Sequence, residues 1–288
     1  MGTFVASVIR DGLFFGECPR WHEGRLWYSD FFDHAVHALV PDGADERVVE
    51  VAGQPAGLGW MPDGSLLIVS MIDRRLLRLD RDGALSEHAD LSTLAPFHCN
   101  DMVVDASGRA YVGNFGSDIY AQRSGATPER APTVLIRVDP DGLASVAADG
   151  MGFPNGSIIS TDGATLIVAE SFGRRLTAFD IAADGSLANR RVWADLGGWI
   201  PDGICLDAAG AVWVANPFEP TVIRVAEGGE TLDTVTLSQG GIACMLGGDA
   251  GDELFVVTAP SAHPQEAAAS PRGRIERARV NVPHAGLP

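Results

Sequence analysis

The sequence predicts an all-β fold, a six-bladed β-propeller, and three observations lead to it. A unit of two apolar strands joined by a glycine-containing hairpin recurs six times along the 288 residues. The copies follow one another at intervals of about 40 to 50 residues, the length of a propeller blade. Almost no segment shows the 3.6-residue apolar period of an amphipathic helix. A closed ring of short sheets accounts for all three.

The six copies share a small or oxygen-bearing residue, an apolar run, a turn and a second apolar run. They begin at Glu17, Ala56, Asn100, Asn155, Asp202 and Gly240. Most copies add a third strand that alternates apolar and polar residues and ends in Asp-Gly or Gly-Gly, as in "TVLIRVDPDG" and "PTVIRVAEGG". Such alternation suits a strand that is covered on one face only. Trp27 and Trp213 occupy matching second-strand positions and are expected in the blade cores.

The two ends of the chain are predicted to close the ring. Residues 3–10, "TFVASVIR", and residues 273–282, "GRIERARVNV", are strand-like and lie outside the repeated units. We expect them to pair in one blade, which leaves no open edge through which that sheet could aggregate. The prediction is a single six-bladed domain over residues 1–288.

Two polar segments interrupt the repeats and are expected to form long loops. Residues 116–132 lengthen the third copy. They form either a lid whose Tyr120 and Arg123 reach substrate or a plain surface loop. Residues 262–273 are expected to be a mobile loop without a functional role.

Composition and charge exclude several classes of function. The formal net charge of −17 argues against a nucleic-acid partner, because phosphate binding needs a concentrated basic face. All 21 basic residues are arginine, which excludes Schiff-base chemistry, pyridoxal-phosphate anchoring and the Walker P-loop. No apolar run approaches the ~20 residues of a membrane span, and the N-terminal stretch lacks a secretory pattern. The four cysteines are scattered, so we expect reduced thiols in a cytoplasmic protein. We also expect a monomer or a small homo-oligomer.

The first residue of each repeat points to a site on the ring axis. The first strand of a propeller blade lines the central channel, so these residues should face one another. Four of them carry oxygen, namely Glu17, Asn100, Asn155 and Asp202. Two carboxylates brought together out of water repel, unless one takes up a proton or a cation neutralises them. Oxygen ligands suit Ca²⁺, Mg²⁺ or Mn²⁺. Taken singly, however, Asn-Gly and Asp-Gly are common turn dipeptides.

Four motifs resemble the SMP-30/gluconolactonase family, also called regucalcin-like proteins. They are "GECPRW", "NDMVVDASGRAYVGN", "FPNGSIISTDG" and "PDGICLDAAGAVWVAN", and the resemblance covers nearly the whole chain. It implies a six-bladed propeller with one divalent metal, and many members hydrolyse sugar lactones. The implied metal ligands are Glu17, Asn155 and Asp202, and Asn100 would contact substrate. Sugar-lactone members usually carry an arginine where this chain has His98, which puts aldonolactone specificity in question. His98 either lines the pocket or is a structural histidine.

The expected activity is therefore the metal-dependent opening of a lactone ring. The metal would polarise the carbonyl of a small-molecule lactone or ester. Ca²⁺ is the first choice, with Zn²⁺, Mn²⁺, Mg²⁺ and Fe²⁺ as alternatives. Asp202 is the candidate base that activates water, because it is ionisable and near the metal. Two other functions stay open, a phosphotriesterase- or aryl-esterase-type hydrolase and a non-catalytic calcium- or ligand-binding propeller.

Overall fold

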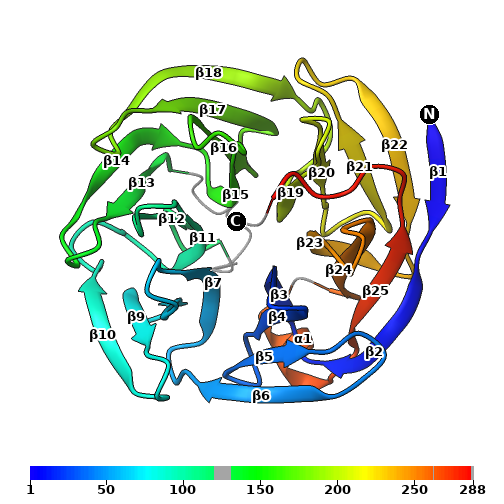
Figure 1. Cartoon of the computed structure of the whole chain (residues 1–288), viewed down its shortest axis with the longest axis horizontal. Coiled ribbons are helices and arrows are strands. Elements are labelled where there is room, and N and C mark those ends of the chain that lie inside the picture. Colours follow the sequence, from blue (N-terminus) through cyan, green and yellow to red (C-terminus); the bar gives the residue numbers. More distant parts are fainter. Residues whose placement is uncertain (120–130, 262, 287–288) are drawn as a thin grey trace, which may run out of the picture.

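The computed structural model describes residues 1–119, 131–261 and 263–286, and it confirms the predicted fold class. Six sheets stand around a central axis as the blades of a propeller (Figure 1). Within the described residues, helix is limited to α1 (Pro264–Ala269), in a stretch that was expected to be a loop. It has six residues, and no helix in the described part of the chain is long and apolar enough to cross a membrane.

In blades 1 to 4 the strand nearest the axis comes first in the chain, and in blades 5 and 6 only the outermost strand, from the N-terminal segment, precedes it. Blade 1 contains β3 (Gly16–His22), β4 (Arg25–Asp30), β5 (Ala35–Leu39) and β6 (Asp45–Glu50). Blade 2 contains β7 (Pro55–Trp60), β8 (Leu66–Ser70), β9 (Arg75–Leu79) and β10 (Leu85–Asp90). Blade 3 contains β11 (Cys99–Val104), β12 (Ala110–Asn114), β13 (Thr133–Val138) and β14 (Ala144–Met151). Blade 4 contains β15 (Pro154–Ile159), β16 (Thr165–Glu170), β17 (Arg175–Ile181) and β18 (Leu187–Asp195). Blade 5 contains β19 (Ile204–Leu206), β20 (Val212–Val214), β21 (Thr221–Val225), β22 (Thr231–Thr236) and β1 (Gly2–Val5). Blade 6 contains β23 (Gly240–Gly247), β24 (Glu253–Ala259), β25 (Gly273–Arg279) and β2 (Ser7–Leu13).

The N-terminal segment closes the ring, although it divides between two blades. β2 pairs antiparallel with β25 as the outer strand of blade 6, as predicted. β1 instead runs parallel to β22 at the outer edge of blade 5. The amide of Ala6, between the two strands, donates to the carbonyl of Thr236, so the chain leaves blade 5 only after that contact. The expectation that residues 3–10 belong to one blade is therefore wrong for residues 3–5, which cover an edge that would otherwise be open.

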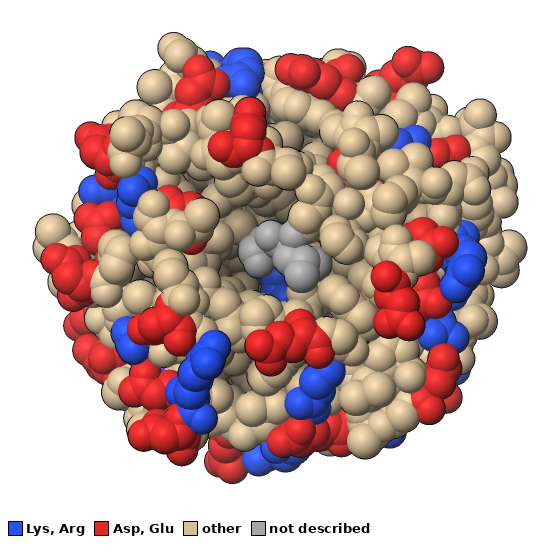
Figure 2. Space-filling view, in the orientation of Figure 1, with Lys and Arg blue, Asp and Glu red and all other residues tan. Residues whose placement is uncertain are grey.

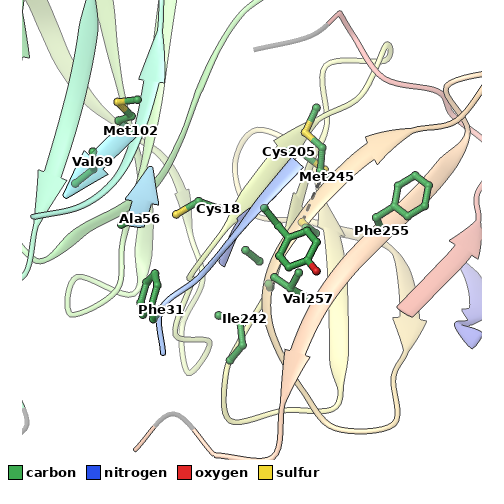
Figure 3. Packing of buried hydrophobic residues seen from close by; sticks show 14 of the residues in the cluster. Cys18, Phe31, Ala56, Val69, Met102, Cys205, Ile242, Met245, Phe255 and Val257 are labelled. Atoms are coloured by element: carbon green, nitrogen blue, oxygen red, sulfur yellow. Dashed lines mark hydrogen bonds between the residues drawn. The ribbon is translucent and has the colours of Figure 1, made fainter. Parts of the chain in front are cut away.

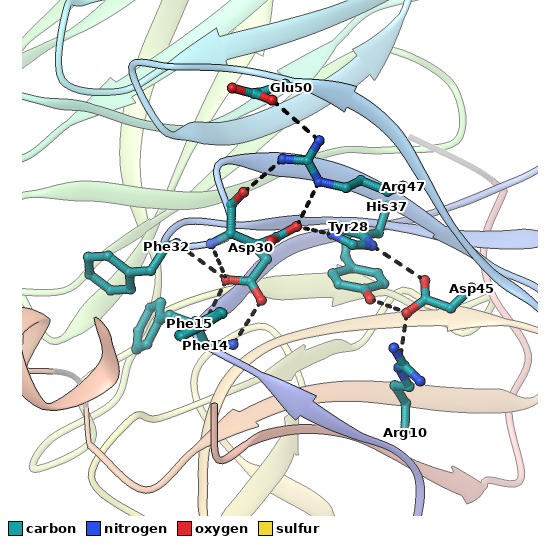
Figure 4. A network of polar contacts seen from close by, with 11 residues as sticks. Arg10, Phe14, Phe15, Tyr28, Asp30, Phe32, His37, Asp45, Arg47 and Glu50 are labelled. Carbon is teal, nitrogen blue, oxygen red and sulfur yellow. Dashed lines mark hydrogen bonds and ion pairs between the residues drawn. The ribbon is translucent and has the colours of Figure 1, made fainter. Parts of the chain in front are cut away.

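A polar network ties the closing strand to blade 1 (Figure 4). Nε of Arg10 on β2 lies 3.0 Å from Oδ2 of Asp45 on β6. Asp45 also accepts a hydrogen bond of 2.8 Å from the hydroxyl of Tyr28 and lies 3.7 Å from Nδ1 of His37. The other ring nitrogen of His37 lies 2.9 Å from a carboxylate oxygen of Asp33. Burial lowers the pKa of His37, but hydrogen bonds and charges from these two carboxylates outweigh that effect and raise it.

The inner strands are buried on both faces, whereas the outer strands face solvent. Every residue of β11 and β12 is buried, and most of β10 is exposed. Neighbouring blades pack through small and flexible apolar side chains such as Ala56, Val69 and Met102 (Figure 3). The alternation seen in the third strands therefore reflects their position further from the axis.

The two tryptophans at matching positions differ in burial. Trp213 is 1% exposed and lies in a blade core, as predicted. Trp27 is only half-buried and lines a groove beside Trp60, with ring centroids 5.4 Å apart. The core prediction is wrong for Trp27, because its side of β4 faces this groove between blades 1 and 2.

Glycine follows both Asn155 and Asp202 because the inner strands approach one another closely. The amide of Gly156 donates to the carbonyl of Asp202 at 3.2 Å, and a Cβ on this glycine would lie 2.6 Å from that oxygen. A Cβ on Gly203 would lie 2.2 Å from the Cβ of Ala243 on the next inner strand. No larger residue fits either position without moving the backbone. The Pro-Asn-Gly and Pro-Asp-Gly units therefore share a packing requirement at the glycine.

The segment that follows β25 covers one end of the channel. Residues 280–286 turn inward from the rim toward the axis (Figure 1), where the amide of Ala285 donates to the carbonyl of Leu206 at 3.3 Å. A cavity of about 270 Å³ borders them, between the ends of β11, β15 and β19. Figure 2 shows this face hollowed toward the axis, with acidic and arginine side chains interspersed around it. The predicted site lies at the other end, where the inner strands start.

Candidate active site

A β-bulge interrupts the pairing near the start of most inner strands. In blade 4, Pro154 pairs with Glu170 and Ser157 pairs with Val168. The chain therefore advances three residues along β15 for two residues along β16, so β15 contains one extra residue. β7 and β11 show the same shift at the same point, whereas in β3 it begins one residue later, after Glu17, and in β23 a shorter shift follows Gly241. A bulge leaves a residue outside the pairing ladder and redirects its side chain. The repeated bulge therefore sets a common position for side chains from different blades.

The register of these bulges identifies the residues that share this position. The last residue of each second strand pairs with Gly16, Pro55, Cys99, Pro154 or Gly240. The residues that follow are Glu17, Ala56, Asn100, Asn155 and Gly241. In blade 5 the amide of Asp202 donates to the carbonyl of Ala215, which gives Asp202 the equivalent place. In blade 6 the equivalent residue is Gly241, whereas the sequence repeats predicted Gly240. The two adjacent glycines carry no side chain that distinguishes them in the sequence.

Asn100 and Asn155 are joined directly by a hydrogen bond. Nδ2 of Asn100 donates to Oδ1 of Asn155 at 2.9 Å. Nδ2 of Asn155 donates to the hydroxyl of Ser171 at 3.2 Å, and that hydroxyl donates to the carbonyl of Pro201 at 2.7 Å. Both asparagines are buried. This chain of bonds orients the Asn155 amide and connects blades 3 and 4 to the residue before Asp202.

Glu17 and Asp202 bring two carboxylates into one buried region. They are 6% and 8% exposed. Burial raises the pKa of Glu17 well above its usual range, and the charges of Asp202 and Asp101 raise it further. Burial also raises the pKa of Asp202 to about 8, with a hydrogen bond from Asn155 opposing the shift and the charge of Asp101 adding to it. Among the described residues, Oδ1 of Asp202 is buried without a hydrogen-bond partner.

Arg20 and Asp101 also lie in this region, and the sequence analysis missed both. Nη2 of Arg20 donates to Oδ1 of Asp101 at 2.7 Å and to the carbonyl of Met102 at 2.6 Å. Both charged side chains are 5% exposed. Their signal in the sequence is a charged residue inside an apolar inner strand, in "ECPRW" and "CNDMVV". Arg20 is paired with Asp101, and no ion pair among the described residues involves Glu17 or Asp202.

Strained backbone adjoins two of the predicted site residues. Cys18, which follows Glu17, has a φ of 49°, and its amide donates to Oε2 of Glu17 at 3.0 Å. Phe153, two residues before Asn155, has a φ of 60°. Left-handed backbone costs about 1–3 kcal/mol for a residue other than glycine and concentrates at functional sites. Cys18 itself is fully buried.

The donor set fits a divalent cation that prefers oxygen. Two buried carboxylates with raised pKa values, one carboxylate oxygen without a partner, and the amide oxygen of Asn155 supply such ligands. No three His, Cys, Asp or Glu side chains in the described part of the chain are grouped to hold a metal. A cation at this position would therefore need the amide oxygen as its third ligand. Ca²⁺ and Mg²⁺ accept carboxylate and amide oxygens, whereas zinc sites are rich in histidine and cysteine.

His98 belongs to a continuous row of rings in blades 3 and 4, which we call the aromatic arc. Its members are Phe97, His98, Phe115, Phe153 and Phe172. Neighbouring ring centroids are separated by 4.0 Å (Phe97–His98), 6.0 Å (His98–Phe115), 4.8 Å (Phe115–Phe153) and 5.1 Å (Phe153–Phe172). Burial lowers the pKa of the half-buried His98, with Asp118 opposing the shift. Tyr120 and Arg123 of the proposed lid lie outside the described residues.

The sequence resembles a family of known proteins over most of its length. A family model described as SMP-30/Gluconolactonase/LRE-like region matches residues 15–260. A pentonolactonase of Haloferax volcanii is 30% identical over 264 residues, which cover 88% of this chain and 85% of that protein. A 6-deoxy-6-sulfogluconolactonase of Pseudomonas putida is 26% identical over an aligned length of 298 residues, which covers 100% of this chain and 99% of that protein. Regucalcin of Danio rerio is 30% identical, covering 88% and 86%.

Solved structures share the fold at lower sequence identity. A structure described as the calcium-binding protein regucalcin from Agrobacterium tumefaciens has a TM-score of 0.82 and 21% identity, covering 100% of this chain and 98% of its own. A gluconolactonase from Xanthomonas campestris has a TM-score of 0.74 and 24% identity, covering 98% and 89%. With a family model matched from residue 15 to residue 260, this chain belongs to the SMP-30/gluconolactonase/LRE-like family.

Proposed function

We propose that this protein is a lactonase whose site is the axial cluster of Glu17, Asn100, Asn155 and Asp202. The observation that carries the proposal is the pair of buried carboxyl groups, Glu17 and Asp202, of which the second has an oxygen without a partner among the described residues. Two relatives support the reaction class, since they are named pentonolactonase and 6-deoxy-6-sulfogluconolactonase. The product of the reaction is a hydroxy acid.

The proposed metal ligands are the carboxylates of Glu17 and Asp202 and the amide oxygen of Asn155. A divalent cation bound there would supply a Lewis acid for the lactone carbonyl. Ca²⁺ is our first choice, because the donors are all oxygen and a structural relative is described as calcium-binding. The two carboxylates provide the opposite charge, and the Asn100 bond holds the amide in place.

Asp202 is the proposed general base. Its Oδ1 has no partner among the described residues, so it can accept a proton from the attacking water. The water oxygen bonds to the carbonyl carbon, the ring C–O bond breaks, and the proton passes to the departing alkoxide. In the chain alone the pKa of Asp202 is about 8, so its ionised form requires a compensating positive charge at neutral pH.

Asn100 is proposed to contact the substrate. Its amide nitrogen carries two hydrogens, and the bond to Asn155 uses one of them. The second can donate to a substrate oxygen on which negative charge develops. Because Asn100 is buried and held by this bond, little reorganisation is needed when the substrate arrives.

The test is a pH-indicator screen of five- and six-membered lactones with protein stripped of metal and then refilled with single cations. We expect turnover that requires a cation, and a loss of about 100-fold or more in kcat for Asp202→Asn. Asp162→Asn is the matched control, because Asp162 is exposed at the other end of the channel. Full turnover by Asp202→Asn with metal bound would remove it as the base. No metal-dependent turnover on any lactone or ester would favour a ligand-binding propeller instead.

We also propose a small-molecule lactone or ester as substrate and the cytoplasm as the compartment. All four cysteines are buried free thiols, the state that a reducing compartment maintains. Cys205 and Cys244 come close, with 3.7 Å between their sulfur atoms. A monomer or small homo-oligomer stays our prediction for the assembly.

A further inference from the structure

The aromatic arc adjoins the proposed catalytic residues through main-chain contacts. His98 lies two residues before Asn100, and its carbonyl accepts a hydrogen bond of 2.9 Å from the amide of Phe115. Phe153 lies two residues before Asn155, and its carbonyl accepts from the amide of Ser171 at 3.1 Å. The side chain of that serine is bonded to Asn155. The arc is therefore held at the same ends of blades 3 and 4 as the two asparagines.

The arc offers a substrate mostly hydrocarbon. Four of its five rings are phenylalanine, and the fifth is the imidazole of His98. The rings at its two ends, Phe97 and Phe172, are half-buried and keep part of their surface accessible. Arg20, whose charge acts on Glu17, is engaged with Asp101 and two backbone carbonyls. A polyhydroxylated ring placed against such a wall would lose hydrogen bonds to water without replacing them.

We propose that the preferred substrates are lactones with an apolar substituent, an alkyl chain or an aryl ring, that packs against the aromatic arc. The inference rests on the proposed lactonase function and names its substrate class. The lactone carbonyl would lie at the axial cluster, and the substituent would point toward blades 3 and 4. Each methylene removed from water should raise kcat/KM about fourfold while it contacts the arc.

The experiment compares six-membered lactones that differ only in their substituents. Parent protein refilled with Ca²⁺ is assayed on δ-valerolactone, δ-hexalactone, δ-nonalactone and glucono-δ-lactone, with spontaneous hydrolysis subtracted. We expect kcat/KM to rise along the alkyl series and to exceed that for glucono-δ-lactone by more than about tenfold. A preference for glucono-δ-lactone would overturn the substrate class and leave the lactonase function standing. No turnover of any of the four with any cation would instead count against the lactonase function.

Variants of Phe172 test whether the lactone substituent contacts the aromatic arc. Phe172→Ala should lower kcat/KM for δ-nonalactone at least about tenfold more than for δ-valerolactone, because only the substituent reaches the arc. Phe172→Leu, which keeps an apolar side chain and guards against misfolding, should fall between. Phe218→Ala is the matched control, since Phe218 is 68% exposed and outside the arc. An equal loss on both lactones would mean that Phe172 supports the fold, which would refute the contact.

Discussion

Replacing Asp202 by asparagine should flatten the pH dependence of stability in the metal-free protein. The folded-state pKa of Asp202 is about 8, against an ordinary value of 3.8. The folded chain therefore keeps this proton at pH values where the unfolded chain has lost it. Unfolding then releases a proton between about pH 4 and pH 8, and the free energy of unfolding falls as the pH rises through this window.

The size of the change in the free energy of unfolding follows from the raised pKa of Asp202. A full proton difference changes the free energy of unfolding by about 1.4 kcal/mol per pH unit. Because the group is half-ionised near pH 8, the loss between pH 6 and pH 8 is about 2 kcal/mol. For a chain of this length, that corresponds to a fall of about 3 °C in Tm. Asparagine has a similar shape but does not ionise, so the variant should lack this contribution.

Thermal and urea unfolding at pH 6, 7 and 8 in the presence of a chelator measure both proteins. The variant should gain stability relative to the parent as the pH rises, by about 2 kcal/mol between the extremes. Adding Ca²⁺ should stabilise the parent more at pH 8 than at pH 6, because ligand binding requires the ionised carboxylate. Asp162→Asn should track the parent throughout. Parallel profiles for the parent and Asp202→Asn would refute the placement of a protonated carboxyl at the axis.

Three further substitutions and one control test the packing, a buried hydrogen-bonded carboxylate and a charged network of the ring. Gly203→Ala should lower the free energy of unfolding by about 1–3 kcal/mol, because its Cβ would lie 2.2 Å from a facing alanine. Gly198→Ala, with open space around the new Cβ, should be nearly neutral in the same urea titration. Glu276→Gln should reduce the urea midpoint by the equivalent of about 1–3 kcal/mol, because the buried carboxylate accepts bonds from the amide and hydroxyl of Ser238. His37 has a raised pKa, so its stabilisation of up to about 1 kcal/mol is present below about pH 6.5 and disappears as the pH rises through the folded value. The difference between the parent and His37→Gln in urea unfolding from pH 5.5 to 8.5 measures it, and a difference that grows with pH would contradict the assignment.

Local sequence signals were sufficient for the architecture of the blades. Strand alternation and glycine turns depend on neighbouring residues, so the repeats and the third strands could be predicted. The division of the N-terminal segment at Ala6 could not, because both halves are strand-like and only the neighbouring outer strands decide which edge each one joins. The groove beside Trp27 was missed for a similar reason, since it forms between two blades.

Some features of the candidate site could likewise be predicted from the sequence, and others could not. Oxygen-bearing residues at one repeat position were visible in the sequence, and the bulges show why that position recurs. The ion pair of Arg20 and Asp101 joins residues 81 positions apart, and nothing in either motif names the other as its partner. The aromatic arc likewise gathers rings from two blades, whereas its members are scattered along the sequence.

The amino-acid sequence by itself determined the number of blades, the oxygen-bearing residues proposed for the axial site and the absence of lysine chemistry, because these follow from residue type and spacing. Only the tertiary structure decided which charges are compensated, which carboxylate oxygen lacks a partner and which rings stand together. Those properties depend on distances between side chains that the chain order does not specify. Burial then converts the distances into shifted pKa values, since a charge removed from water responds strongly to its neighbours.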